Sequence, residues 1–484
     1  MQLDFDRPNL FSFDDSFASL TFLERTEPRL IAKVRASFEE NRSFCQEHVR
    51  PLALRTDLEL QRNPDALATE LLDLAVRHHR FSRFVPGILG GESDSTLITP
   101  MITAEETAAV DAGFVGVLSG HGLGMAALAY TMNLKLLDWF AKETLRGERE
   151  GSPFLIDCAI TEPGAGTDME EVALLPHAQL VSEAKRVPGG ALISGRKCFI
   201  SGGHFATHHL VILPFDRKNP VESAAVFLVP SDAPGFSLGK LENKMGQKAG
   251  PASELVFEDC FVPDEHIVLD AGTLHGGSFE PMLLGVLGTT RIYVGAWATG
   301  IGRGAFEIAL EFAKRTKFRG KTLIQHQFAQ RALVDMFINV HKSRSVYLEA
   351  MFALMNASGG AGAPAFTSAP WFQALFQSYP VRKVRHSDRL RKIMMDRAVP
   401  KLDALRRVQF YSSLAKVVGS DLAMENCHRA LELMGAVGIR HGAGAEKLFR
   451  DAKLCQIFEG TNQLNRLHMF QHFIKRDDAQ LEVF

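Results

Sequence analysis

The chain has 484 residues, of which 46% are hydrophobic and 23% are charged, enough apolar material for several packed domains. This composition excludes intrinsic disorder, collagen-like repeats and a disulfide-rich miniprotein. The 54 basic and 56 acidic residues give a formal net charge of -2, so no overall attraction to nucleic acid or to an anionic membrane is expected.

Helices are expected in the first part of the chain. Apolar side chains recur at helical spacing over 28–49 and 66–79, and after a Pro/Gly break at 84–91 a long helical zone runs from 103 to about 146. From about 154 to 265 the period shortens toward two, which predicts strands at 154–160, 191–201, 209–213, 224–229 and 254–261. Such short strands favour a small barrel or sandwich. Helical spacing returns over 301–312, 327–356 and 404–435.

One segment interrupts the last helical region. Residues 356–364 are low in complexity and indicate a loop, and a basic stretch at 381–407 holds ten Lys and Arg against three Asp. A solvated helix face or intersubunit salt bridges would explain this stretch. The alternative is a docking site for a phosphate-bearing ligand or an acidic partner.

The six cysteines are spread along the chain, and none forms a C-x-x-C pair, which argues against a zinc knuckle or a thioredoxin-like site. Free thiols fit a reducing compartment, and the first residues lack a basic leader with an apolar run. A cytoplasmic protein is therefore expected. No run of about 18 uncharged apolar residues is recognised, so no membrane span is expected.

Several motifs with chemical meaning follow one another along the chain. A Pro/Gly-rich turn leaves a strand, and glycine there lets backbone N–H groups approach a ligand. The motifs are CAITEPGAGTD (158–168), GRKCFISGG (195–203), MGQK (245–248), ELVFEDCFVP (254–263), RDAK (450–453) and IFEGTNQ (457–463). In this order, and on these elements, they resemble the acyl-CoA dehydrogenase family over nearly the whole chain.

The resemblance implies an α+β fold with three domains. These are an N-terminal α-helical domain (1–153), a middle β-barrel (154–275) and a C-terminal four-helix bundle (276–484), with an insertion at about 357–400 that compact members lack. It also implies FAD, an acyl-CoA substrate, electron-transfer flavoprotein as electron acceptor, a homo-oligomer (tetramer or dimer) and a place in fatty acid metabolism.

The family's reaction removes the α-proton of an acyl thioester while a hydride leaves the β-carbon for the flavin. A carboxylate can remove so weak an acid only where the carbonyl is polarised and a dry site raises the pKa of the base. The resemblance places this base at Glu459, which follows apolar bulk and precedes Gly460. Some members carry the base before an Arg on a helix; here that pair is Thr290-Arg291, and Thr cannot serve.

The resemblance also assigns binding residues. It implies contacts with FAD at Ile160, Thr161, Gly166, Thr167, Phe199, Ser201, Arg315, Phe318, Gln327, Glu432, Gly435, Thr461 and Gln463. It implies substrate contacts at Thr167 and Gly460. Arg315, Phe318 and Gln327 would reach the FAD of a neighbouring subunit.

The chain departs from the family's pattern at several of these positions. Phe199 replaces a common Trp but can still stack on a flavin ring. The spacing from Phe318 to Gln327 is one residue longer than usual, and Glu432 replaces a Gln. Pro251 and Ser253 stand where members often carry Asp and Arg for the substrate.

Other motifs have simpler explanations. GHGLG (120–124) and GIGRG (300–304) look like dinucleotide loops but lie in helical contexts, which favours close helix packing. His204 and His208 have a ligand-like spacing, yet a solvated loop after a strand is favoured and no metal site is expected. Arg450-Asp451 is expected to position the base loop by charge pairing.

Two other functions stay open at this point. An acyl-CoA oxidase or a nitroalkane-oxidase-like enzyme would keep the fold and the base but let oxygen reoxidise the flavin. A non-catalytic flavoprotein with a binding or stress-response role is the other alternative, which the basic stretch supports and Glu459 opposes.

Overall fold

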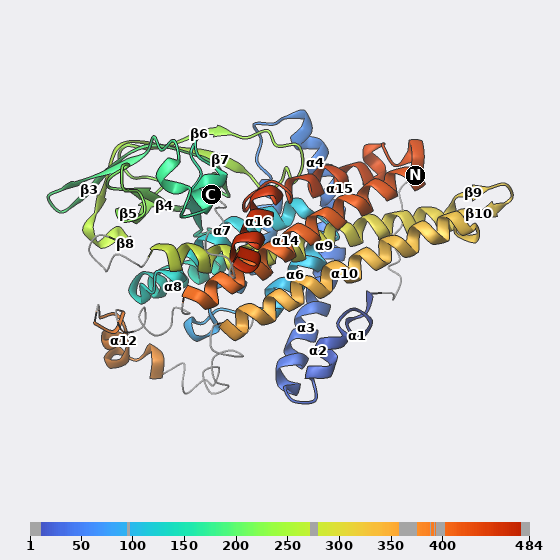
Figure 1. Cartoon of the computed structure of the whole chain (residues 1–484), viewed down its shortest axis with the longest axis horizontal. Coiled ribbons are helices and arrows are strands. Elements are labelled where there is room, and N and C mark those ends of the chain that lie inside the picture. Colours follow the sequence, from blue (N-terminus) through green and yellow to red (C-terminus); the bar gives the residue numbers. More distant parts are fainter. Residues whose placement is uncertain are drawn as a thin grey trace.

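The computed structural model describes residues 11–93, 97–271, 279–357, 375–387, 389–391, 393 and 402–475. Long helices extend from a strand-rich region at one end of the molecule to a small hairpin at the other (Figure 1). The helix–strand–helix order agrees with the predicted α+β fold. The domain boundaries near 153 and 275 stay a prediction.

The amino-terminal region is helical. Its helices are α1 (Phe13–Ser16), α2 (Ala18–Leu23), α3 (Pro28–Phe44), α4 (Arg50–Arg62), α5 (Thr69–Arg77), α6 (Ile98–Ala108), α7 (Ala112–Tyr130) and α8 (Leu134–Glu150). The apolar helix α7 packs against α4, α5, α6 and α8. The zone predicted as one helical stretch from 103 to 146 is divided by two N-caps. The Asp111 side chain accepts a hydrogen bond from the Gly113 amide, and Asn133 accepts one from the Leu136 amide.

Eight strands form two four-stranded sheets that pack on each other. Their orders are β1-β4-β5-β8 and β2-β3-β7-β6, where the β1–β4 pair is parallel and the other pairs are antiparallel. The strands are β1 (Ile156–Ala159), β2 (Glu183–Val187), β3 (Gly190–Ser201), β4 (His208–Pro214), β5 (Ala224–Pro230), β6 (Phe236–Leu241), β7 (Ala252–Pro263) and β8 (Ile267–Asp270). Inward side chains of both sheets form one core.

The main described helices of the carboxy-terminal region are α9 (Phe279–Arg315), α10 (Gln327–Ala357), α14 (Leu402–Met434), α15 (Ala445–Leu454) and α16 (Asn462–Met469). Helices α9, α10 and α14 pack along their lengths, and α15 lies against α9 and α14. Between α9 and α10 the short strands β9 (Lys317–Phe318) and β10 (Lys321–Thr322) form the hairpin. The bundle therefore joins the hairpin to the strand-rich end.

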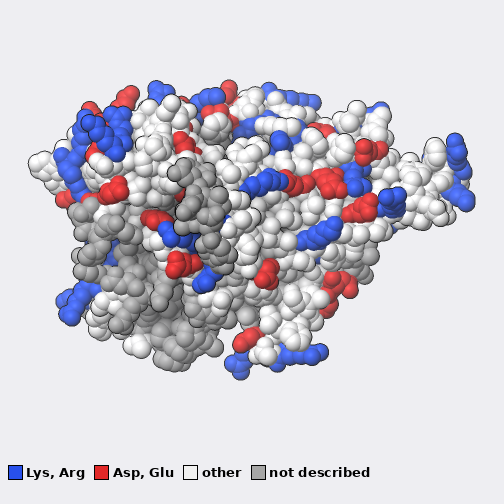
Figure 2. All heavy atoms as spheres, in the orientation of Figure 1, with Lys and Arg blue, Asp and Glu red and all other residues white. Residues whose placement is uncertain are grey.

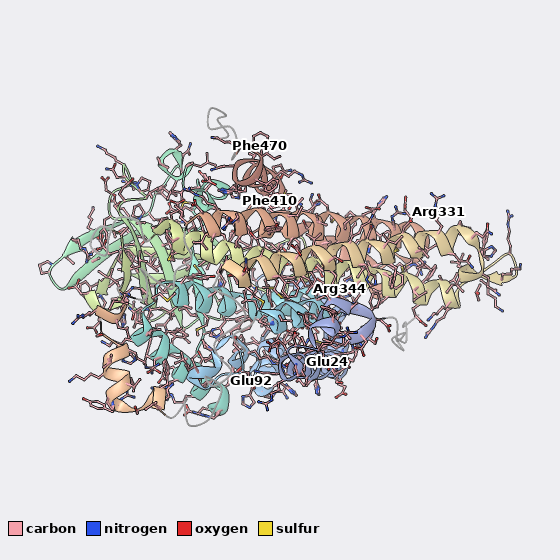
Figure 3. The ribbon with its side chains drawn as sticks, turned by 60° about the horizontal axis from the view of Figure 1, so that its bottom comes forward. Glu24, Glu92, Arg331, Arg344, Phe410 and Phe470 are labelled. Atoms are coloured by element: carbon pink, nitrogen blue, oxygen red, sulfur yellow. The ribbon has the colours of Figure 1, made fainter. Side chains whose placement is uncertain are left out.

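Buried ion pairs join α6 to the bundle. The Glu105 carboxylate accepts hydrogen bonds from Arg344 Nε (3.1 Å) and from the Tyr347 hydroxyl (2.7 Å) on α10. On α9, Arg303 pairs with the neighbouring Glu106. Arg344 lies where α10 meets the amino-terminal helices (Figure 3). These charges are shielded from water, so each depends on its partner for stabilisation.

Glycines allow helix α7 to lie very close to the sheets. A Cβ on Gly120 would come within 2.4 Å of the Ser201 carbonyl oxygen, and one on Gly300 of α9 would come within 2.3 Å of the Glu105 carbonyl oxygen. Both glycine motifs therefore serve close packing, as predicted.

Among the described residues, α7 is the one helix long and apolar enough to cross a membrane by length and composition. The run 112–130 carries no Asp, Glu, Lys or Arg, which the sequence analysis overlooked. In the most apolar 18-residue stretch of this helix, 72% of the residues are buried inside the protein, which is typical of a core helix.

Part of the expected insertion is described. Helix α12 (Tyr379–Arg385) lies beside α8, where Arg385 pairs with Asp138 at 2.9 Å. Arg391 donates hydrogen bonds to the backbone oxygens of Thr131 (3.0 Å) and Val268 (2.6 Å). These two arginines of the basic stretch face the protein, whereas Lys383 and Arg389 are exposed. Residues 358–374, 388, 392 and 394–400 of the expected insertion lie outside the described residues.

Charges of both signs are interspersed on the face shown in Figure 2. At the hairpin tip the exposed charges are Lys317, Arg319 and Lys321. The mixed surface agrees with the balanced charge count of the sequence.

Candidate active site

A cavity of about 1270 Å³ lies between the strand-rich region, α7, α9 and the loop that carries Glu459. A typical small-molecule site encloses about 300–1000 Å³. The cavity is therefore large enough for more than one ligand group. Most of its lining is apolar, and its polar groups include Glu170, Thr290 and Glu459.

The structure brings eight of the predicted site residues to this cavity. They are Ile160, Thr161, Gly166, Thr167, Phe199, Ser201, Glu459 and Thr461. Gly460 is buried behind Glu459, and Gln463 is exposed on α16. The remaining five are at the hairpin end: Arg315, Phe318, Gln327, Glu432 and Gly435.

The hairpin-end residues share one neighbourhood away from the cavity. Arg315 ends α9, Phe318 lies in β9 and Gln327 begins α10. Glu432 and Gly435 lie at the end of α14, whose Arg429 pairs with Asp335 of α10 at 3.2 Å. Within one chain these residues do not complete the cavity.

A buried ion pair fixes the turn that carries Thr161 and Thr167. Lys197 Nζ donates to a Glu162 carboxylate oxygen (2.8 Å) and to the Ile160 carbonyl oxygen (2.8 Å), and both charged side chains are shielded from solvent. Glu162 also accepts hydrogen bonds from the amides of Val181 (2.7 Å) and Ser182 (3.0 Å). Glu162 and Lys197 were not predicted as site residues, although both lie inside the quoted motifs.

Phe199 and Ser201 reach the cavity from strand β3. Phe199 has a left-handed backbone (φ 57°), and its relative exposure is 58%, unusual for a large apolar residue. Register shifts in the β3–β7 pairing occur between Lys197 and Ile200. This irregularity turns the aromatic ring toward the cavity and not into the sheet core.

Glu459 lies in a strained turn. Both Glu459 (φ 56°) and Gly460 (φ 75°) have left-handed backbones, a conformation that is costly for Glu and that surrounding contacts must hold. We call residues 457–463 the base loop.

Three donors hold the carbonyl oxygens of the base loop. Arg291 Nε donates to the Glu459 oxygen (3.1 Å), and Lys416 Nζ donates to the Gly460 oxygen (2.6 Å). The side-chain amide of Asn465 donates through Nδ2 to the Gly460 and Thr461 carbonyl oxygens, at 3.0 Å each. None of these three donors was predicted, because each lies on a helix outside the motif. An uncharged stretch of helix interrupted by a single Lys or Arg is the signal that could have found Arg291 and Lys416.

The Glu459 carboxylate accepts a hydrogen bond from Thr290 Oγ1 at 2.6 Å. Thr290 cannot be a base, but here it orients the Glu459 carboxylate. Burial raises the pKa of the Glu459 carboxyl to about 7, and the nearby Glu170 carboxylate acts in the same direction. The Thr290 hydrogen bond and the cations Arg291 and Lys416 oppose this shift. Near neutral pH the group can therefore both accept and release a proton.

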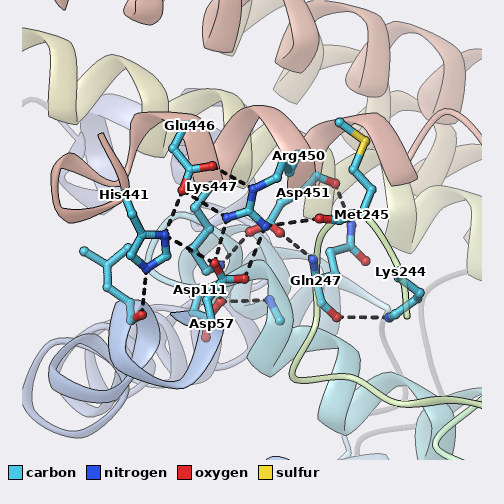
Figure 4. A network of polar contacts seen from close by, with 12 residues as sticks. Asp57, Asp111, Lys244, Met245, Gln247, His441, Glu446, Lys447, Arg450 and Asp451 are labelled. Carbon is cyan, nitrogen blue, oxygen red and sulfur yellow. Dashed lines mark hydrogen bonds and ion pairs between the residues drawn. The ribbon is translucent and has the colours of Figure 1, made fainter. Parts of the chain in front are cut away.

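The charge pairing expected for Arg450 and Asp451 is present, but it does not reach the base loop (Figure 4). Arg450 Nη2 lies 2.7 Å from an Asp57 oxygen, and Arg450 Nη1 donates to the Met245 carbonyl oxygen at 3.1 Å. Asp451 pairs with Lys447 at 2.6 Å and accepts a hydrogen bond from the Gln247 amide. The network anchors α15, which leads into the base loop, to α4 and to the loop 244–250.

The histidines with ligand-like spacing have separate protein partners. His204 Nδ1 lies 2.7 Å from Ser253 Oγ, whereas His209 Nδ1 lies 2.7 Å from an Asp157 oxygen. His208 packs against the rings of Trp139 and Phe154. The expectation of a solvated loop was wrong for His208, which is buried in strand β4 beside the buried His209.

Comparison with known proteins identifies the family. Residues 158–260 match the model of the acyl-CoA dehydrogenase middle domain, and residues 281–369 and 389–473 match that of the acyl-CoA dehydrogenase C-terminal domain. Together they cover more than half of the chain, and their order agrees with the sheets that lie between helical regions. The chain belongs to the acyl-CoA dehydrogenase family and is an enzyme of that class; the family is generally FAD-dependent.

Individual relatives are similar over nearly their full length. A probable acyl-CoA dehydrogenase of Mycobacterium tuberculosis is 28% identical over 436 residues, which is 90% of this chain and 93% of the relative. The cyclohexane-1-carbonyl-CoA dehydrogenase of Geobacter metallireducens is 27% identical over 92% of this chain and 98% of its own length. The structure of butyryl-CoA dehydrogenase from Megasphaera elsdenii has the same fold, with a TM-score of 0.71, 23% identity and coverage of 91% of this chain and 98% of that chain.

Proposed function

We propose that this enzyme catalyses the FAD-dependent α,β-dehydrogenation of an acyl-CoA thioester, with Glu459 as the base. The observation that carries the proposal is the position of the Glu459 carboxyl group. It lines a largely apolar cavity, accepts a hydrogen bond from Thr290, and has a pKa raised to about 7. The relatives named above, which act on acyl-CoA substrates by their names, support the same reaction.

The residues around the cavity fit a flavin. The exposed ring of Phe199 offers a stacking surface, and the Ser201 and Thr167 hydroxyls offer hydrogen bonds beside it. A Cβ on Gly166 would meet a single neighbouring atom, at 3.9 Å, so its backbone is open to a ligand. We propose that these residues hold FAD together with Ile160, Thr161 and Thr461. When bound, FAD supplies the acceptor for the hydride that leaves the β-carbon.

The remaining wall suits the acyl group. Apolar side chains of α7, α8 and α9 line it: Leu123, Ala126, Ala129, Leu137, Val286 and Leu287. These side chains exclude water, which keeps the Glu459 carboxylate basic. Thr290 fixes one carboxylate oxygen of Glu459, so the other can accept the α-proton. The base loop, whose backbone oxygens accept hydrogen bonds from buried donors, keeps the Glu459 carboxylate in this position during proton transfer.

We also propose that electrons pass to electron-transfer flavoprotein and that the enzyme is a homo-oligomer. The hairpin-end residues Arg315, Phe318 and Gln327 would then contact the FAD of another subunit, which explains why they lie away from their own cavity. Fatty acid metabolism and a cytoplasmic location stay predictions.

The experiment is anaerobic bleaching of the purified holoenzyme with a panel of acyl-CoA thioesters of straight, branched and cyclic chains. Reduction of the flavin absorbance by at least one thioester is expected, followed by reoxidation by electron-transfer flavoprotein. Fast reoxidation by oxygen alone would indicate an oxidase. A protein that binds flavin but is bleached by no thioester would support the non-catalytic alternative, and one without flavin would refute the proposal.

A further inference from the structure

A second carboxylate, Glu170, lines the same cavity as Glu459, and the chemistry described so far gives it no role. It ends the 3₁₀ turn η5 (Thr167–Glu170), three residues after a predicted flavin contact. Its side chain is 16% exposed. An acid in so dry a place is costly unless a partner compensates it.

The partner of Glu170 is the same arginine that holds the base loop. Arg291 Nη2 lies 3.1 Å from Glu170 Oε2, while its Nε donates to the Glu459 carbonyl oxygen, also at 3.1 Å. Arg291 Nη1 donates to Gln409 Oε1 (2.8 Å) and to His468 Nδ1 (2.9 Å). The fully buried guanidinium is therefore fixed on all sides and joins Glu170 rigidly to the base loop.

Glu170 also touches the base loop directly. A Cβ on Gly460 would lie 2.9 Å from Glu170 Oε2, so the carboxylate rests against the Gly460 backbone. Any larger residue at position 460 would displace it. The left-handed turn at Glu459 and Gly460 and the Glu170 side chain thus pack together as one unit.

We propose that Glu170 is a positioning residue of this site: a second carboxylate, fixed by Arg291 against the base loop, that holds the turn and makes Glu459 a stronger proton acceptor. The inference rests on the proposed role of Glu459 as the base. Its physical reason is that two carboxylates in one dry cavity repel each other, so a proton on Glu459 relieves the repulsion.

The neighbouring cations Arg291 and Lys416 do not cancel the repulsion between the Glu170 and Glu459 carboxylates. Arg291 compensates Glu170, and Lys416 on α14 reaches the base loop, but burial lowers the pKa of Lys416 to about 7, so its charge is only partial near neutrality. Burial is the larger cause of the raised pKa of Glu459, and the Glu170 charge is the next. Among the described residues, the titratable groups around the unit also include Cys158 on β1, His468 on α16, Glu171 (2.8 Å from His468 Nε2), His472 and Cys455.

The test compares the pH dependence of anaerobic flavin reduction in wild type, Glu170→Gln and Glu170→Asp. Gln keeps an oxygen for Arg291 but removes the charge, so the acid limb should move down by about one pH unit. As a fraction of its own alkaline plateau, the rate at pH 6 should then be about fivefold higher than in wild type, whereas the plateau rate itself should be lower because the base is weaker. Glu170→Asp keeps the charge and should keep the acid limb near its wild-type position. The exposed Glu222→Gln is the matched control and should change neither.

A second readout does not depend on turnover. Carbon-13 NMR of glutamate-labelled protein, with Glu459→Gln to assign the signal, should show the Glu459 titration moving down in Glu170→Gln. An unchanged acid limb with an unchanged titration would overturn the inference and leave the proposed function standing. A uniform loss of rate at all pH values would reduce Glu170 to a structural role. A wild-type enzyme that no thioester reduces would instead refute the proposed function.

Discussion

The two ends of the bundle differ in how complete they are. Next to the sheets, one chain encloses the cavity and holds the base loop with buried donors. At the other end, the hairpin projects into solvent, and Phe318 remains 45% exposed although it is a large apolar residue. The first end encloses a site, whereas the predicted contact residues at the second end lie away from that site in the described part of the chain. Each prediction below tests one side of this difference.

The largest expected effect is at the cavity. Glu459→Gln keeps the size of the side chain and removes the base, so flavin reduction by an acyl-CoA should slow by about 10²–10⁴-fold or more. The flavin content should stay near that of wild type. Stopped-flow absorbance of the anaerobic holoenzyme measures the rate. Glu222→Gln is the control, and a Glu459→Gln enzyme with wild-type reduction would remove Glu459 from the mechanism.

The next effect concerns the buried ion pair between Lys197 and Glu162, which fixes the turn that carries Thr161 and Thr167. Lys197→Met leaves the Glu162 charge buried without its cation, which should cost about 3–5 kcal/mol in the free energy of unfolding. Denaturant unfolding and flavin content after purification measure the loss. The exposed Lys185→Met on β2 should change stability by less than about 0.5 kcal/mol. Equal stabilities of the two variants would show that the buried pair does not hold the turn.

The acidity of Glu459 predicts a pH dependence. Only the deprotonated carboxylate can accept the α-proton, so the rate of flavin reduction should rise with pH through about 7. Below that pH the rate should fall by about tenfold per unit, because the protonated fraction grows. A rate that stays flat from pH 5 to pH 8 would contradict a buried base with this pKa.

The smallest expected effect tests the hairpin end. Arg315→Ala should weaken FAD binding by about tenfold, as expected for one lost charged hydrogen bond, while the exposed Arg331→Ala on α10 should have little effect (Figure 3). Mixed oligomers of Arg315→Ala and Glu459→Gln sharpen the comparison. If each site combines one chain's cavity with another chain's hairpin end, mixing restores one intact site. No recovery on mixing would show that Arg315 acts within its own chain or not at all.

The helix–strand–helix order could be predicted because hydrophobic period is a local property. The caps at Asp111 and Asn133 were missed, since they divide a stretch whose apolar spacing does not change. Strands β2, β6 and β8 were also missed. The edge strands β2 and β6 have mixed burial patterns, and β8 has four residues, so their alternation is weak.

The residues of the site likewise fall into those that the sequence motifs predict and those that they do not. Glu459, Thr161 and Phe199 lie in compact motifs, and the structure brings them to one cavity, while their roles stay predictions. Arg291, Lys416 and Glu170 act through backbone oxygens and packing, so no motif assigns their roles, although Arg291 and Lys416 stand out as lone charges in uncharged helix stretches. Their roles follow from the three-dimensional approach of α9, α14 and the turn η5, and only a structure supplies that.

The ion pairs between α6 and the bundle have a consequence for synthesis on the ribosome. Glu106 has an early counter-ion in Arg42, which lies 3.0 Å away, but the counter-ions of Glu105, Arg303 and Arg344, follow it by 198 and 239 residues. Until then the amino-terminal helices would have to hide the uncompensated Glu105 carboxylate in an apolar interior. Their final docking must therefore wait until most of the chain has been translated, and a nascent chain that stops before residue 344 should remain sensitive to proteases there.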